Sequence, residues 1–132
     1  MLSFHVPIRP TPKERPRVGR GRAWTPQRTL EAEAAVRRAC ASYRPIPEGT
    51  PFHAEVVSVY KRPRGHLKKD GSLSALGLRH PVPRGADVDN LAKLVLDALQ
   101  GHLFTDDALC VRLITSKEYG PVDEVFVRLL WT

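Results

Sequence analysis

The sequence has few of the features that mark secreted or zinc-binding proteins. Only two of its 132 residues are cysteines, Cys40 and Cys110, with no CxxC motif and no regular spacing. A disulfide framework or a zinc site needs more thiols than this, so we expect two reduced cysteines in a cytoplasmic protein. The five histidines are scattered without an HxxxH pair, which also argues against zinc.

Long apolar runs and a leader sequence are lacking too. No apolar stretch approaches the roughly 20 residues of a membrane-spanning helix. Residues 1–9 alternate apolar and polar side chains, unlike a signal peptide. We therefore expect a soluble protein with no membrane partner. A chain of 132 residues fits one domain that buries roughly two thirds of its unfolded surface.

Acidic residues are scarce in the first two thirds of the chain. Residues 1–86 carry 17 Lys and Arg against 6 Asp and Glu, whereas residues 87–132 carry 4 against 8. The net charge of +7 and the pI near 9.9 indicate a polyanionic partner. Five of the seven aspartates nevertheless lie between positions 87 and 107. Such a group repels phosphate unless a divalent cation lies among the carboxylates.

The apolar pattern predicts a single α+β domain over residues 1–132, with two main helices on a mixed sheet in the order β-α-β-α-β-β. Alternating or β-branched stretches predict four strands, at 2–8, 52–61, 109–119 and 124–131. The last two are expected to form a hairpin through the turn at 120–123. Helices are predicted from Thr25, as N-cap, to about Tyr43, and over 90–100.

Two basic segments interrupt this pattern. Residues 10–23 are expected to form a loop or irregular hairpin, and residues 62–86 a long loop that becomes ordered on DNA. Their cations are candidates for phosphate contacts: Lys13, Arg15, Arg17, Arg20, Arg22, Arg62, Arg64, Lys68, Lys69 and Arg84. Trp24 and Tyr60 are candidates for base stacking, although a solitary aromatic residue is more often part of the core.

The acidic group begins just before the second helix. If residues 87–89 are extended, Asp87 and Asp89 point to the same side. The helical period places Lys93 and Asp97 on one polar stripe, and the turn after the helix brings Asp106 or Asp107 back toward it. Four or five carboxylates would then converge as ligands for Mg²⁺, with Mn²⁺ as a substitute and no nucleotide cofactor.

Each residue also has a structural interpretation. Asp89 could cap the helix, Asp106 and Asp107 could be turn residues, and Lys93 with Asp97 could be an ordinary surface pair. Taken singly, these interpretations are favoured. Together, in twenty-one residues of a basic protein, they are less satisfactory, because structural acids would be scattered among the basic residues.

The acidic string resembles that of a known family, the RusA-like Holliday junction resolvases. The matching residues are Asp87-Val88-Asp89-Asn90-Leu91-Ala92-Lys93, then Asp97-Ala98-Leu99, then Asp106-Asp107, similar to the family's D-x-D-N-x-x-K, D-A-L and D-D pattern. A weaker similarity covers Lys13-Glu14-Arg15-Pro16-Arg17, Ala23-Trp24-Thr25-Pro26 and Lys117-Glu118-Tyr119. Ala86 departs from the family, which often has proline there, and residues 62–84 vary among members.

The resemblance implies that Asp87, Asp89 and Asp107 are metal-binding catalytic carboxylates and that Lys93 is an essential lysine. It implies a homodimer with one active site per subunit, which cuts two strands of like polarity at a four-way DNA junction during recombination and repair. Because the family is common in bacteriophages and prophages, it also indicates a phage origin. Two alternatives stay open: a nuclease for flaps or forks, and a non-enzymatic basic DNA-binding protein.

Overall fold

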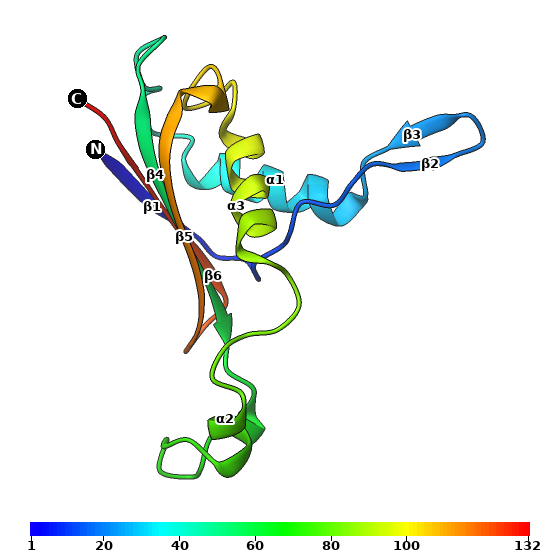
Figure 1. Cartoon of the computed structure of the whole chain (residues 1–132), viewed down its shortest axis with the longest axis vertical. Coiled ribbons are helices and arrows are strands. Elements are labelled where there is room, and N and C mark those ends of the chain that lie inside the picture. Colours follow the sequence, from blue (N-terminus) through cyan, green and yellow to red (C-terminus); the bar gives the residue numbers. More distant parts are fainter.

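Figure 1 shows a computed structural model that describes residues 1–132. Its elements are β1 (Leu2–Val6), β2 (Arg17–Gly19), β3 (Arg22–Trp24), α1 (Gln27–Ala39), β4 (Phe52–Lys61), the 3-10 turn η1 (Arg64–His66), α2 (Ala75–Arg79), α3 (Val88–Leu99), the 3-10 turn η2 (Asp107–Leu109), β5 (Cys110–Gly120) and β6 (Glu124–Leu130). The predicted α+β class is confirmed. The hairpin β2–β3 and the short α2 are additions to the predicted order.

Four strands form one mixed sheet in the order β1-β6-β4-β5. β6 is antiparallel to β1 and β4, whereas β5 is parallel to β4 and lies at an edge. The prediction of a β5–β6 hairpin is therefore wrong, because β4 lies between these strands. The turn after β5 crosses the end of β4, where the Asp123 carboxylate accepts a 2.8 Å hydrogen bond from the Lys61 amide. This bond satisfies a backbone donor that the sheet leaves free.

The core lies between one face of the sheet and the helices α1 and α3 (Figure 1). Alternate strand residues such as Val56 and Val127 are excluded from solvent, as are Leu94 and Leu99 of α3. Burying each such side chain contributes roughly 1.5–3 kcal/mol. The apolar stripe of α3 thus fixes the helix on the sheet and leaves its polar stripe facing outward.

The boundaries of α1 differ from those predicted. Pro26, not Thr25, holds the N-cap position, and it offers no side-chain hydrogen bond. The helix also ends at Ala39 and does not continue to Tyr43. The Tyr43 hydroxyl instead donates a 2.7 Å hydrogen bond to the Ser3 carbonyl of β1. A tertiary contact therefore decides the conformation of the last predicted turn.

Two basic segments project from the body of the protein in different directions (Figure 1). The hairpin arm (residues 17–24) turns at Arg20 and Gly21, whose φ angles of 51° and 77° are those of a two-residue primed turn. The helical arm (residues 62–86) contains η1, α2 and a bridge between Leu67 and Leu73. The predicted long loop therefore contains two short helical turns, which the sequence did not reveal because a five-residue helix is too short to show a clear periodicity.

Cys40 and Cys110 are free thiols, one buried and one half-buried. Burial raises the pKa of both thiols above the ordinary value of 9.0, so they are protonated and weakly reactive near neutral pH. The helices are too short or too polar for any of them to cross a membrane.

Candidate functional site

The first acidic residues of the predicted site lie at the start of α3. Asp87 holds the N-cap position, and the helix begins at Val88, two residues earlier than predicted. The extended geometry expected over 87–89 is therefore wrong from Val88 onward, where the carbonyl accepts a 3.3 Å hydrogen bond from the Thr115 hydroxyl of β5. The Asp87 carboxylate makes no capping hydrogen bond, and Asp89, in the first turn, is exposed. The helix dipole favours both negative charges, but neither carboxylate is used in a capping bond or an ion pair.

Lys93 and Asp97 follow Asp89 at intervals of four residues, so the three lie on one face of α3. The Lys93 ammonium is 59% exposed and lies 3.9 Å from Asp97, a loose pair. Asp97 has a stronger partner in Lys13, at 3.2 Å, and Lys13 also contacts Glu33 of α1 at 3.1 Å. Asp97 thus belongs to a link between helices, whereas Lys93 is available to a ligand.

The ionic state of Lys13 supports this assignment. Burial by itself lowers the pKa of Lys13, but the hydrogen bonds and charges of Glu33 and Asp97 outweigh it and raise the pKa above 10.5. Lys13 is therefore a cation at any physiological pH, and its side chain is only 22% exposed. Sequence reasoning placed Lys13 on DNA and Asp97 on a metal, whereas the structure pairs them with each other.

Asp106 and Asp107 lie at the opposite end of α3. The Asp106 carboxylate accepts a 2.9 Å hydrogen bond from the Ala108 amide, which is the turn role considered as its structural alternative. The Asp107 amide donates a 3.1 Å hydrogen bond to the Gln100 side chain, just beyond the last residue of α3. Twelve helical residues span about 18 Å. Asp107 is therefore roughly a helix length from Asp87.

The acidic residues do not meet in one chain as predicted. No group of three or more His, Cys, Asp or Glu side chains is close enough to hold a metal ion. The reason is the path of the chain: Asp87 and Asp89 lie at the first turn of α3, and Asp107 lies past its last. A single protomer thus does not fit a three-carboxylate metal centre, although its carboxylates are ligands of the type that Mg²⁺ prefers.

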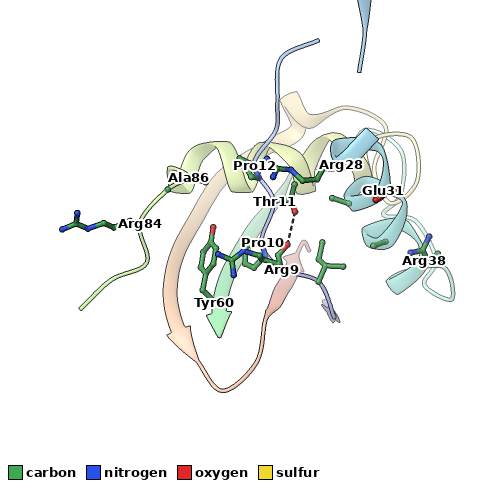
Figure 2. A pocket seen from close by; sticks show the side chains of 14 residues that line it. Arg9, Pro10, Thr11, Pro12, Arg28, Glu31, Arg38, Tyr60, Arg84 and Ala86 are labelled. Atoms are coloured by element: carbon green, nitrogen blue, oxygen red, sulfur yellow. Dashed lines mark hydrogen bonds between the residues drawn. The ribbon is translucent and has the colours of Figure 1, made fainter. Parts of the chain in front are cut away.

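A groove of about 590 Å³ lies beside the start of α3. It is bounded by α1, by the segment after β1 and by residues 84–86, which directly precede Asp87 (Figure 2). Four arginines and one acid line it: Arg9, Arg28, Arg38, Arg84 and Glu31. This charge suits a phosphate backbone that passes next to Asp87.

The four arginines differ in how firmly they are held. Arg9 lies 5.1 Å from the centre of the Tyr60 ring, and Arg28 forms a 2.8 Å ion pair with Glu14. No carboxylate lies within ion-pair distance of Arg38 or Arg84. These two cations are therefore the ones most free to bind an anion.

The sequence of the chain decides its family. The profile of a family described as endodeoxyribonuclease RusA matches residues 7–129. The chain belongs to the RusA endodeoxyribonuclease family. The match confirms the resemblance seen in the acidic motif and places the protein among nucleases that act on DNA, and its range includes both arms. A search of curated proteins found no match.

In this RusA family member, the basic residues predicted to bind DNA fall into two groups. Three are engaged within the protein: Lys13 as described, Arg17 in a 3.7 Å pair with Glu14, and Arg62 over the Tyr119 ring at 4.2 Å. The others are exposed and have no ion pair: Arg15, Arg20, Arg22, Arg64, Lys68, Lys69 and Arg84. Of the two aromatic candidates, Trp24 is 49% exposed and Tyr60 only 6%.

Sequence reasoning missed three of the groove arginines, Arg9, Arg28 and Arg38. The DNA-binding candidates were all taken from the two basic segments, whereas Arg28 and Arg38 lie on α1. Their spacing with Glu31, at i, i+3 and i+10, puts all three on one helix face. That polar face was the signal available. No local pattern indicates that Arg9 faces the same groove.

A cluster of rings packs the helical arm against the end of the sheet. His66 is buried, stacks on His80 at 5.6 Å and meets the Tyr119 edge at 5.4 Å between ring centres. Arg62 covers the Tyr119 ring and approaches the His66 nitrogen at 3.4 Å. Burial, with the neighbouring charges of Arg62 and His80, lowers the pKa of His66 below 6.5. The base of the arm is therefore held by ring packing around a neutral His66 and by the Arg62 cation on the Tyr119 ring.

Proposed function

We propose that this protein is a metal-dependent, structure-selective endonuclease that acts as a homodimer and resolves Holliday junctions by paired nicks. Membership of the RusA endodeoxyribonuclease family supports the nuclease activity. The observation that carries the proposal to this site is that Asp87 and Asp89 have no ion pair and Lys93 only a loose one, beside an arginine-lined groove. Structural acids would be expected to cap the helix or to pair with cations.

The groove and the start of α3 have complementary roles in this proposal. Arg38 and Arg84 hold a phosphate backbone by charge, without reading the base sequence. The strand then passes Ala86 and reaches the carboxylates of Asp87 and Asp89. Lys93, one helical turn after Asp89, neutralises the scissile phosphate and stabilises negative charge that develops there. Selection of a branched substrate comes from its shape, with the exposed cations of the two arms contacting different duplexes.

The acidic residues require a second copy of the chain. Asp107 is exposed and lies about a helix length from Asp87, as derived above. A two-fold axis perpendicular to α3 and near its middle places the start of α3 in one protomer beside the end of α3 in the other. Asp107 of a second copy can therefore join Asp87 and Asp89 and form a set of oxygen donors suited to Mg²⁺. In this arrangement, dimerisation and metal binding are coupled, and the two sites are related by symmetry.

The first experiment is a cleavage gel with a synthetic four-way junction, a flap and a fork, each with Mg²⁺ and with chelator. We expect two symmetric nicks in the junction that need Mg²⁺. Asp89→Asn should lower the nicking rate by more than about 100-fold and leave junction binding equal or tighter, because a charge that repels phosphate is removed. Asp70→Asn, in the helical arm, is the matched control and should cut normally.

Each outcome has a defined meaning. Full cleavage by Asp89→Asn would overturn the site assignment. Preferred cutting of the flap or the fork would identify a branched-DNA nuclease of a different specificity. Binding of the junction without cutting by the wild-type protein in Mg²⁺ or Mn²⁺ would support the non-enzymatic alternative.

A mixing experiment tests the shared site. The variants Asp89→Asn and Asp107→Asn are each expected to be inactive alone. In a mixed dimer, one site carries both substitutions and the other carries neither. When equal amounts of the two variants exchange subunits, half of the dimers are mixed, so about a quarter of all sites are intact. Total nicking should therefore return to about a quarter of the wild-type level. If each chain held a complete site, both sites of the mixed dimer would be damaged. No recovery after verified exchange would then contradict the shared arrangement.

A further inference from the structure

The hairpin arm carries a tryptophan that the core does not cover. Trp24 is the last residue of β3, is 49% exposed, and belongs neither to the hydrophobic core nor to the residues packed against it. β2 and β3 pair only with each other and extend away from the body of the protein (Figure 1). Tryptophan has a large apolar surface that is usually well buried in a folded chain. Its exposure on this arm points to a contact with another molecule.

The register of the hairpin determines how the indole ring lies. Arg17 pairs with Trp24, and Gly19 pairs with Arg22. These four residues share one face of the hairpin, because cross-strand partners and alternate residues point to the same side. A Cβ at Gly19 would lie 3.2 Å from the indole, so the glycine leaves room for the ring to lie across the neighbouring strand. The hairpin therefore supports the ring from one side, and about half of the ring's surface stays open.

Two recesses meet at Trp24. The first, of about 490 Å³, is formed by the hairpin itself and has Arg20 and Arg22 beside the indole. The second, of about 410 Å³, is lined in part by the start of α1 and includes Arg28 and Glu14. Glu14 pairs with Arg28 at 2.8 Å, whereas no carboxylate lies within ion-pair distance of Arg20 or Arg22. The first recess thus combines an open aromatic ring with two free cations.

We propose that the first recess binds an unpaired DNA nucleotide, with its base stacked on the Trp24 indole and the adjoining phosphates held by Arg20 and Arg22. An aromatic ring with neighbouring cations is the chemistry by which proteins bind single strands of any sequence. The inference rests on the proposed function only in the choice of DNA as the nucleic acid. It adds a means of recognising a branch, because the bases of a closed duplex are stacked on one another and are not available to the ring.

Arg28 connects this part of the arm with the groove beside α3. Its side chain lines both the groove and the second recess at Trp24. A DNA strand that follows the groove can therefore continue past Arg28 to the hairpin arm. The segment that enters the arm is bonded to α3 through the amide and the ammonium group of Lys13. The base of the arm is thus fixed relative to the acidic residues at the start of that helix.

A purely structural role for Trp24 leads to a different expectation. A two-stranded hairpin is only marginally stable by itself, and an indole that lies over Gly19 also stabilises it. Any large apolar side chain could fill that role, whereas stacking on a base needs an aromatic ring. A comparison of Trp24→Leu with Trp24→Phe therefore separates the two roles.

The main test uses the fluorescence of Trp24. The other tryptophan of the chain is Trp131, so Trp131→Phe leaves Trp24 as the single reporter. Titration with a single-stranded oligothymidylate, without metal, should quench the emission, because stacking places a base against the indole. An abasic oligonucleotide with the same number of phosphates should leave the emission unchanged. Equal quenching by the abasic strand would show that the site binds phosphate alone and would overturn the stacking.

Affinity measurements with the same oligothymidylate provide the second test. Trp24→Leu should bind about tenfold more weakly, whereas Trp24→Phe should stay within about threefold of the wild type. The preference of Trp24→Leu for a four-way junction over a closed duplex should fall as well. The matched control is Val18→Ala, because Val18 is 78% exposed on the opposite face of the same hairpin. It should bind like the wild type, and circular dichroism checks that every variant is folded.

The outcomes separate this inference from the proposed function, since neither measurement requires cutting. Unchanged binding by Trp24→Leu, or an equal loss in Trp24→Leu and Trp24→Phe, would overturn the stacking site. A protein that nicks junctions but shows no quenching of Trp24 would contradict this inference and leave the nuclease assignment intact. Quenching by a wild type that does not cut DNA would uphold the stacking site and contradict the proposed function.

Discussion

The Lys13 ammonium lies 3.2 Å from the Asp97 carboxylate, so the segment that leads into the hairpin arm is tied to the helix that carries the candidate site. The Lys13 amide also donates a 3.0 Å hydrogen bond to the Asn90 carbonyl of the same helix. Both bonds position this segment along α3. The hairpin arm and the acidic motif are therefore held in a fixed relation to each other.

Removal of the Lys13 cation should destabilise the protein. Lys13→Met leaves the buried Glu33 without a cation and the half-buried Asp97 with only the loose contact to Lys93. We expect the free energy of unfolding to fall by about 1–3 kcal/mol, since unpaired buried charges are costly and this site is partly open to solvent. Urea denaturation measures the change. Arg15→Ala, at an exposed residue with no ion pair, should change it by less than about 0.5 kcal/mol.

Asp97 and Asp89 should respond differently to the same substitution. Asp97→Asn removes one of the two carboxylates that pair with Lys13, so we expect lower stability but a nicking rate within about tenfold of the wild type at saturating DNA and Mg²⁺. Asp89→Asn should have the reverse profile, with stability kept and nicking lost. Thermal melting and single-turnover cleavage separate the two effects. A loss of nicking by Asp97→Asn as large as that of Asp89→Asn would assign Asp97 to the metal site after all.

The groove arginines should contribute to junction affinity through charge. Arg38→Ala and Arg84→Ala each remove one cation without breaking an ion pair. We expect weaker binding to every DNA sequence, and a salt dependence, plotted as log K against log[salt], that is shallower by about 0.9 per lost phosphate contact. Fluorescence anisotropy across a salt series measures both. Arg44→Ala, an exposed arginine outside the groove, should leave the slope unchanged.

The helical arm should loosen in acid. His66 has a pKa below 6.5 in the folded protein, so the unfolded arm binds a proton more readily than the folded one. The stability contributed by neutral His66 is therefore present above pH 6.5 and is lost as the pH falls below that value. Hydrogen exchange of residues 62–86 at pH 7.5 and pH 5 should show this loss. Replacing His66 by Asn should flatten the dependence, whereas His102→Gln should not.

Several features follow from the sequence by itself. The strand over residues 52–61 was predicted with its observed ends, because ten alternating or β-branched residues between breakers specify a strand locally. The apolar stripe of α3 was equally clear, since its 3.6-residue period repeats over three turns. The family followed from the D-x-D-N-x-x-K motif and its spacing, which was confirmed by the match over residues 7–129.

Only the tertiary structure decided which residues and strands become neighbours. Sequence spacing suggested that Asp107 returns to Asp87, but the two residues lie at opposite ends of a straight helix of about 18 Å. Asp97 looked like a metal ligand until Lys13, 84 positions earlier, proved to be its partner. The position of β5 at the edge depends on where β6 enters the sheet. Local patterns report period and polarity, whereas such pairings depend on the path of the whole chain.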